Sequence, residues 1–108
     1  MAKKGGYVYV LCDPATDLFK IGMTKGSVEK RLKNLQTGNG TELHVVTSYH
    51  TDYPYKLEKM LHNHFHLKKE MNEWFNLTND DLLDFNGTCS SIEEVIKSLT
   101  DNPFFNPV

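Results

Sequence analysis

Four polar side chains stand out in this sequence because together they could handle a phosphate group. They are a phenol, two cations and a carboxylate: Tyr9, Lys20, Arg31 and Glu58. An arginine binds phosphate oxygens through its planar fork, and carboxylates are common protein ligands of Mg²⁺. A cation close to a phenol lowers the pKa of its hydroxyl toward use as a base. If the four side chains converge on one face, they form a site that handles phosphate groups.

The first two of these residues are expected on neighbouring strands. Residues 7–12 and 18–22 are rich in β-branched and aromatic side chains, and the Asp and Pro chemistry of residues 13–17 predicts a turn between them. The resulting β-hairpin would carry Tyr9 and Lys20. Because the turn is tight, the two side chains could be neighbours on one face of the sheet.

The other two residues are expected on helices. Ser27 is a plausible N-cap for a helix that carries Arg31 and ends at Gly38. Pro54 opens a second helix, whose first turn carries Glu58. The apolar stripe of this second helix consists of Leu57, Met60, Leu61, His64 and Phe65. This pattern predicts that His64 is a core histidine.

The rest of the chain completes an α+β domain. Residues 43–51 look like a third strand, residues 73–77 are short and extended, and residues 80–85 predict a short helix. Ser91 and Glu94 form a capping box, which predicts that the final helix begins there. The fold class expected is therefore α+β, with a small antiparallel sheet of about three strands flanked by helices.

Composition limits the class of protein further. The 108 residues are enough for one domain, and the formal net charge is −2. Residues 1–69 carry a charge of +5 and residues 70–108 one of −7, so a basic face can coexist with an acidic back. No apolar run suits a membrane span or a signal peptide, and Cys12 and Cys89 form neither a disulfide framework nor a metal-type pair. These features lead us to expect an intracellular (cytoplasmic) protein that does not enter a membrane.

Five short motifs occur in an order that resembles a known family. They read YVYVL, FKIGMT, RLKNLQTGN, LEKMLHNHF and EWFNL. Each motif is weak alone, but their order and the eleven-residue step from Tyr9 to Lys20 resemble the GIY-YIG nuclease superfamily. The similarity is greatest to its short phage- and virus-type branch, in which the second motif reads KIG. The motif core covers about residues 6–77, which leaves residues 78–108 as a C-terminal helical extension of a single domain.

The resemblance implies a metal-dependent endonuclease and a role for each residue. Glu58 would bind one divalent cation, Mg²⁺ or Mn²⁺, and Arg31 would neutralise charge on the phosphoryl oxygens. Tyr9 would orient or deprotonate the attacking water, with Lys20 as its cationic neighbour. His62 lies one helical turn from Glu58 and could instead carry the proton or act as an outer-shell ligand. The choice of general base between Tyr9 and His62 stays open.

Nucleic acid is the partner that this activity requires, and DNA is expected although RNA stays open. Candidate contacts to it are Lys25, Lys30, Lys33 and Asn39. Glu73, before the tryptophan of the last motif, is a secondary candidate for the site.

Two other interpretations use the same residues. A nucleic-acid-binding or adaptor module would keep the fold without turnover, and a salt bridge that locks Glu58 would favour it. A small structural or protein-interaction domain would need an exposed apolar patch and no basic face. A lone module could also gain binding surface as a homodimer, for which the apolar Phe104-Phe105 pair is one candidate contact.

Overall fold

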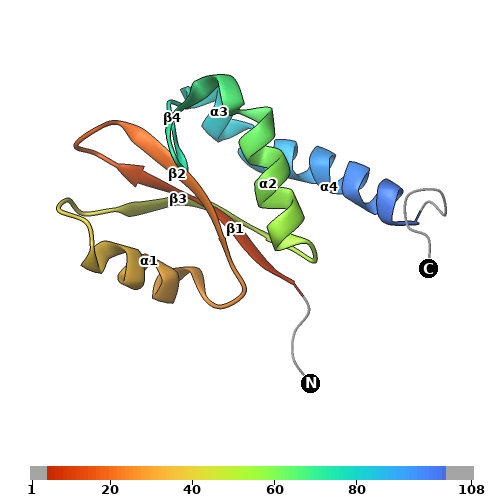
Figure 1. Cartoon of the computed structure of the whole chain (residues 1–108), viewed down its shortest axis with the longest axis horizontal. Coiled ribbons are helices and arrows are strands. Elements are labelled where there is room, and N and C mark those ends of the chain that lie inside the picture. The colour runs from red at the N-terminus through yellow and green to blue at the C-terminus, as the bar shows by residue number, and fades with distance from the viewer. Residues whose placement is uncertain (1–4, 102–108) are drawn as a thin grey trace.

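The computed structural model describes residues 5–101, with side chains through residue 99. The fold is built on an antiparallel sheet whose strands differ in length (Figure 1). Its strands are β1 (Gly6–Asp13), β2 (Leu18–Thr24), β3 (His44–Thr51), β4 (Lys69–Met71) and β5 (Trp74–Phe75). Its helices are α1 (Val28–Thr37), α2 (Pro54–His64), α3 (Asn79–Leu83) and α4 (Phe85–Asp101), with a 3₁₀ turn η1 (His66–Lys68). The predicted α+β class is confirmed. Phe104 and Phe105, the candidate dimer contact, lie outside the described residues.

The sheet has five strands in the order β3-β1-β2-β5-β4, and not the three expected. The two additional strands contain only three and two residues, so neither is long enough to show the alternation that identifies a strand. The predicted hairpin of β1 and β2 is confirmed, and it pairs Tyr9 with Gly22 and Leu11 with Lys20. β5 pairs with β2 only at Phe19 and Lys20.

Successive side chains of β1 enter two different cores, because they point to opposite faces of the sheet. Val8 and Val10 pack in the larger core with residues of α2 and α4. Tyr9 and Leu11 pack on the other face with Val28 of α1 and its neighbours. Figure 1 shows α1 on one side of the sheet and α2 with α4 on the other. The predicted site residues are thereby divided between two layers.

The helices that carry Arg31 and Glu58 begin where the sequence predicts. The Ser27 hydroxyl accepts a hydrogen bond from the Lys30 backbone N–H at 3.1 Å, which confirms the N-cap of α1. Pro54 is the first residue of α2. His64, however, is exposed and lies edge-on to Phe65, so its prediction as a core residue is wrong. Leu57, Leu61 and Phe65, spaced four residues apart, fill the contact with the core instead.

The last helix begins at Phe85, so the capping box predicted at Ser91 is wrong. Phe85, Cys89 and Ile96 are all buried along one face of α4. Burial of this face outweighs the poor helix propensity of the residues between them. No helix among residues 5–101 combines the length and the apolar character needed to cross a membrane.

Candidate functional site

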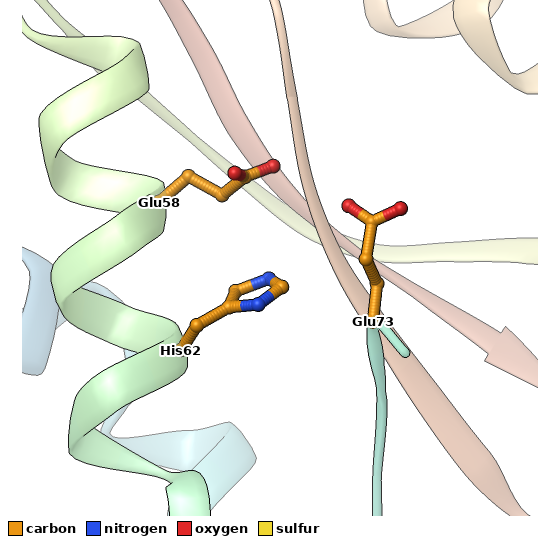
Figure 2. A group of neighbouring side chains, drawn as sticks. All are labelled: Glu58, His62 and Glu73. Atoms are coloured by element: carbon orange, nitrogen blue, oxygen red, sulfur yellow. The ribbon is translucent and has the colours of Figure 1, made fainter. Parts of the chain in front are cut away.

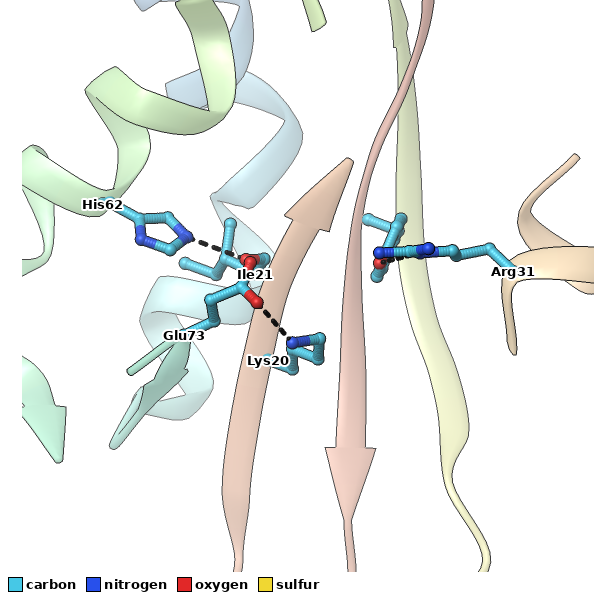
Figure 3. Close-up of polar contacts among 6 residues, drawn as sticks. Lys20, Ile21, Arg31, His62 and Glu73 are labelled. Atoms are coloured by element: carbon cyan, nitrogen blue, oxygen red, sulfur yellow. Dashed lines mark hydrogen bonds and ion pairs between the residues drawn. The ribbon is translucent and has the colours of Figure 1, made fainter. Parts of the chain in front are cut away.

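The backbone of Ile21 joins the three elements around the site (Figure 3). Its N–H donates to the Glu73 carbonyl at 3.1 Å, directly beyond the point where β5 stops pairing with β2. Its carbonyl lies 2.8 Å from Nε2 of His62 on α2. A carbonyl only accepts, so His62 donates through Nε2. The backbone of one buried residue of β2, Ile21, therefore positions both His62 and Glu73.

The glycine of the second motif is required by the packing of Tyr9. The Tyr9 side chain is only 1% exposed and lies across Gly22, its partner in the neighbouring strand. A Cβ atom added at Gly22 would lie 2.5 Å from the Tyr9 hydroxyl oxygen and 2.6 Å from Cζ. Any larger residue would therefore push the phenol out of its position.

We expect Gly22→Ala to lower the free energy of unfolding by about 1–3 kcal/mol, the usual cost of overpacking a core. Gly26→Ala is a matched control, because its added Cβ would meet only the Thr24 hydroxyl oxygen, at 3.9 Å. Chemical denaturation of both variants measures the difference. Equal stability of the two variants would show that Tyr9 does not lie against Gly22 in solution.

Tyr9 and Arg31 meet on the α1 side of the sheet. Nε of Arg31 donates to the Tyr9 hydroxyl oxygen at 3.4 Å, while the arginine side chain remains exposed. Burial raises the pKa of Tyr9, and the opposing effect of Arg31 does not cancel it. The hydrogen bond with Tyr9 raises the pKa of Arg31, which stays cationic. Tyr9 is therefore protonated at neutral pH, which favours the orienting role over the deprotonating one.

Lys20 is tied to a carboxylate and not to the phenol. Its Nζ donates to Oε2 of Glu73 at 2.7 Å, and it lies 5.9 Å from the centre of the Trp74 ring. Only 9% of Lys20 is exposed, whereas the Glu73 side chain is 43% exposed, so only the lysine end of this ion pair is largely shielded from water. The expectation that Lys20 supplies the cationic neighbour of Tyr9 therefore needs correction: Arg31 occupies that place.

Glu58, His62 and Glu73 form a cluster with the spacing of metal ligands. One ligand atom from each lies within 4.8 Å of the other two, and all three residues are partly buried. Figure 2 shows Glu58 and His62 side by side on α2, both directed toward Glu73. Two carboxylates and an imidazole are a donor set that suits a divalent cation such as Mn²⁺, and the two carboxylates alone suit Mg²⁺. These residues therefore fit the cation that the resemblance implies.

Glu58 carries a charge that nothing else in the described chain neutralises directly. Among residues 5–101 it has no ion-pair or hydrogen-bond partner. Burial raises the pKa of its carboxyl group, although the nearby charges of His62, Lys20 and Arg31 act to lower it. Glu58 is thus not locked in a salt bridge, the arrangement that would have favoured a non-catalytic module.

The structure brings the five predicted catalytic residues into one electrostatic neighbourhood. Tyr9 is affected by the charges of Arg31, Glu73 and Glu58, and Glu58 is affected by those of His62, Lys20 and Arg31. These side chains come from β1, β2, α1, α2 and the residue before β5. The sequence alone indicates Glu73 only as a secondary candidate, because no local pattern links it to Lys20, 53 residues away.

The predicted nucleic-acid contacts differ in their exposure and hydrogen bonding. Lys25, Lys30 and Lys33 are all exposed. The pitch of α1 places Lys30 about 100° and Lys33 about 160° from Arg31 in the same direction around the helix, so Lys30 is the nearer of the two to Arg31. The amide nitrogen of Asn39 donates to the Thr41 carbonyl at 2.9 Å and to its hydroxyl at 3.1 Å. This amide holds the loop after α1 together, so we leave Asn39 out of the proposed interface.

The fold and the site together define an α+β domain with two carboxylates, two cations and a phenol gathered around strands β1 and β2. Comparison with known families matches residues 6–96 to the T5orf172 domain. The chain therefore belongs to the T5orf172 domain family, which is a family of nuclease-like domains. No curated protein matched the chain. No solved structure matched it either.

Proposed function

We propose that this protein is a metal-dependent endonuclease that hydrolyses phosphodiester bonds in DNA by one-metal chemistry of the GIY-YIG type. The observation that supports this proposal most is Glu58, a partly buried carboxylate without a direct countercharge, close to His62 and Glu73. A divalent cation would supply the positive charge that this carboxylate lacks. Membership of a nuclease-like family supports the same proposal.

Glu58 would hold the divalent cation, and Glu73 and His62 lie near enough to contribute. A cation bound there supplies Lewis-acid polarisation of the scissile phosphate and countercharge for the leaving 3′ oxygen. His62 keeps α2 against β2 through its hydrogen bond to Ile21, and so fixes the position of Glu58 one turn earlier in the helix. When its ring is neutral, His62 donates through Nε2 and keeps one lone pair at Nδ1, which can bind the cation or accept a proton but not both.

Arg31 and Tyr9 would act on the phosphate and on the attacking water. The exposed guanidinium uses only Nε on Tyr9, so its two terminal nitrogens are available for a bidentate contact with phosphoryl oxygens. The protonated Tyr9 hydroxyl would orient the water and not remove its proton. Lys20 would keep Glu73 in place and add positive charge to the site.

The nucleic acid would pass over α1 and the start of α2. Tyr55, one turn before Glu58 on α2, is 65% exposed and lines a pocket of about 380 Å³ together with Lys25 and Lys56. An exposed aromatic ring beside lysines suits a base with its phosphate. Lys30 lies about 100° around α1 from Arg31, closer to it than Lys33 does.

We expect Lys30→Gln to weaken DNA binding and to reduce the dependence of log affinity on log salt by about 0.9, the value of one phosphate contact in duplex DNA. Lys97→Gln on α4, on the other side of the sheet from α1, removes the same charge and should leave the slope unchanged. Fluorescence anisotropy at several salt concentrations, with EDTA present to prevent cleavage, measures both. An equal effect of the two variants would contradict the proposed path of the DNA.

Supercoiled plasmid tests the activity itself. We expect nicked and then linear DNA with Mg²⁺ or Mn²⁺ and intact plasmid with EDTA. The alternative, a non-catalytic binding or adaptor module, predicts no cleavage with either metal but a gel retardation that fades as salt increases. A single-stranded RNA substrate in parallel decides whether DNA is the correct substrate class.

A further inference from the structure

We infer that Glu73 serves two partners in turn: Lys20 when the site is free of metal, and the divalent cation together with Glu58 when the site is loaded. Lys20 is then a resident countercharge with which the cation competes. This inference rests on the proposed function, since it concerns the same cation, but it assigns a second carboxylate and a built-in competitor to that site.

The geometry brings Glu73 within reach of both partners. Its Oε2 accepts a hydrogen bond from Lys20 Nζ at 2.7 Å, while one of its oxygens lies within 4.8 Å of the ligand atoms of Glu58 and His62. Figure 3 shows Glu73 directed toward Lys20 across β2, and Figure 2 shows Glu58 directed toward the same carboxylate. A carboxylate has two oxygens and about four lone-pair positions, so Glu73 can contact a cation without leaving its place.

The backbone keeps Glu73 at this position. The Ile21 N–H donates to the Glu73 carbonyl, and the residue before Glu73, Asn72, turns the chain with a φ of 51°. The following residue, Trp74, pairs with Lys20 in the sheet and contacts its ammonium group. Glu73 is therefore placed by the sheet itself and does not depend on Lys20 alone for its position.

The charges explain why Lys20 and a cation would compete. Two carboxylates and one ammonium leave the cluster with one net negative charge, and Lys20 is largely shielded from water. A partly buried carboxylate is stabilised by a positive partner, because burial of an unpaired charge is costly. Removal of Lys20 would leave both Glu58 and Glu73 for the cation, and would also remove the repulsion between the ammonium and the metal.

Titration with Mn²⁺, followed by electron paramagnetic resonance of the free ion, tests this inference without any cleavage. We expect Glu73→Gln to weaken Mn²⁺ affinity by about 10–100-fold. We expect Lys20→Met to strengthen it by about tenfold, the opposite direction. Glu94→Gln and Lys97→Met on α4 are matched controls for loss of an exposed carboxylate and of a lysine, and should leave the affinity unchanged.

The outcomes separate this inference from the proposed function. Binding that is lost in Glu58→Gln but unchanged in both Glu73→Gln and Lys20→Met would overturn the inference alone. No Mn²⁺ binding by the unaltered protein would overturn the metal of the proposed function, and the inference with it. If Lys20→Met does not fold, the ¹⁵N NMR signal of Lys20 Nζ in the unaltered protein decides. A shift on addition of Mg²⁺ supports the competition, and an unchanged signal at saturating Mg²⁺ contradicts it.

Discussion

Replacement of Glu58 by glutamine is expected to reduce metal-dependent cleavage by at least about a hundredfold and, at neutral pH, to stabilise the fold. The loss of activity follows because the amide keeps the shape of the side chain but removes the charge that binds the cation. The gain in stability follows because burial raises the pKa of Glu58, so the ionised carboxylate is less stable in the folded protein than in the unfolded chain. A residue that costs stability but is needed for activity is typical of a functional site.

The sign of this stability effect depends on pH. Because the pKa of Glu58 is higher in the folded state, its carboxyl group lowers stability as pH rises from its unfolded-state pKa through its folded-state pKa. Glu58→Gln should therefore equal the unaltered protein in stability at acidic pH and exceed it at neutral pH. Thermal unfolding at several pH values measures this difference. Glu94→Gln, an exposed carboxylate on α4, should show neither effect. A destabilised Glu58→Gln would indicate a structural role instead.

Replacement of Arg31 by alanine is expected to slow cleavage by about 10²–10³-fold, the usual cost of removing one group that stabilises charge in a transition state. Arg31 is exposed, so its loss should change the free energy of unfolding little. The pKa of Tyr9 should rise further, because Arg31 acts to lower it. Single-turnover rates at saturating protein separate the loss of chemistry from weaker binding of the DNA.

Two variants on the same helix control for charge. Arg31→Lys keeps the positive charge but not the planar fork, and we expect it to restore only part of the rate. Lys33→Ala removes a charge about 160° around α1 from Arg31 and should leave the single-turnover rate unchanged. If Arg31→Ala and Lys33→Ala lose the same factor, Arg31 contributes only general electrostatic attraction, and its place at the phosphate is wrong.

Features governed by local chemistry could be predicted from the sequence. The hairpin follows from two β-rich segments around one turn, and the beginning of α1 follows from the hydroxyl of Ser27. The beginning of α4 could not be predicted, since the burial of Phe85 decides it and a capping box at Ser91 is only a local signal. Strands β4 and β5 are too short to show a period.

In the site too, local features could be predicted and contacts between distant residues could not. The order of the motifs predicts that Tyr9, Arg31 and Glu58 lie close together, and in the structure the charges of Arg31 and Glu58 affect the pKa of Tyr9. The pairing of Lys20 with Glu73 joins residues far apart in the chain, and no spacing rule reveals it. The pKa of Tyr9 depends on how deeply the ring is buried, which the sequence alone does not contain. The resemblance predicts Lys20 as the cationic neighbour of Tyr9, whereas the structure places Arg31 there.

The most direct test of the proposed nuclease is single-turnover cleavage of one labelled DNA duplex across a range of Mg²⁺ concentrations. The unaltered protein and Glu58→Gln would be compared after both have been treated with EDTA and dialysed. We predict that added Mg²⁺ restores saturable cleavage to the unaltered protein and not to Glu58→Gln, while both remain folded. Cleavage that does not depend on Mg²⁺, or equal rates for the two proteins, would contradict the assignment of Glu58 as the metal-binding residue of an endonuclease.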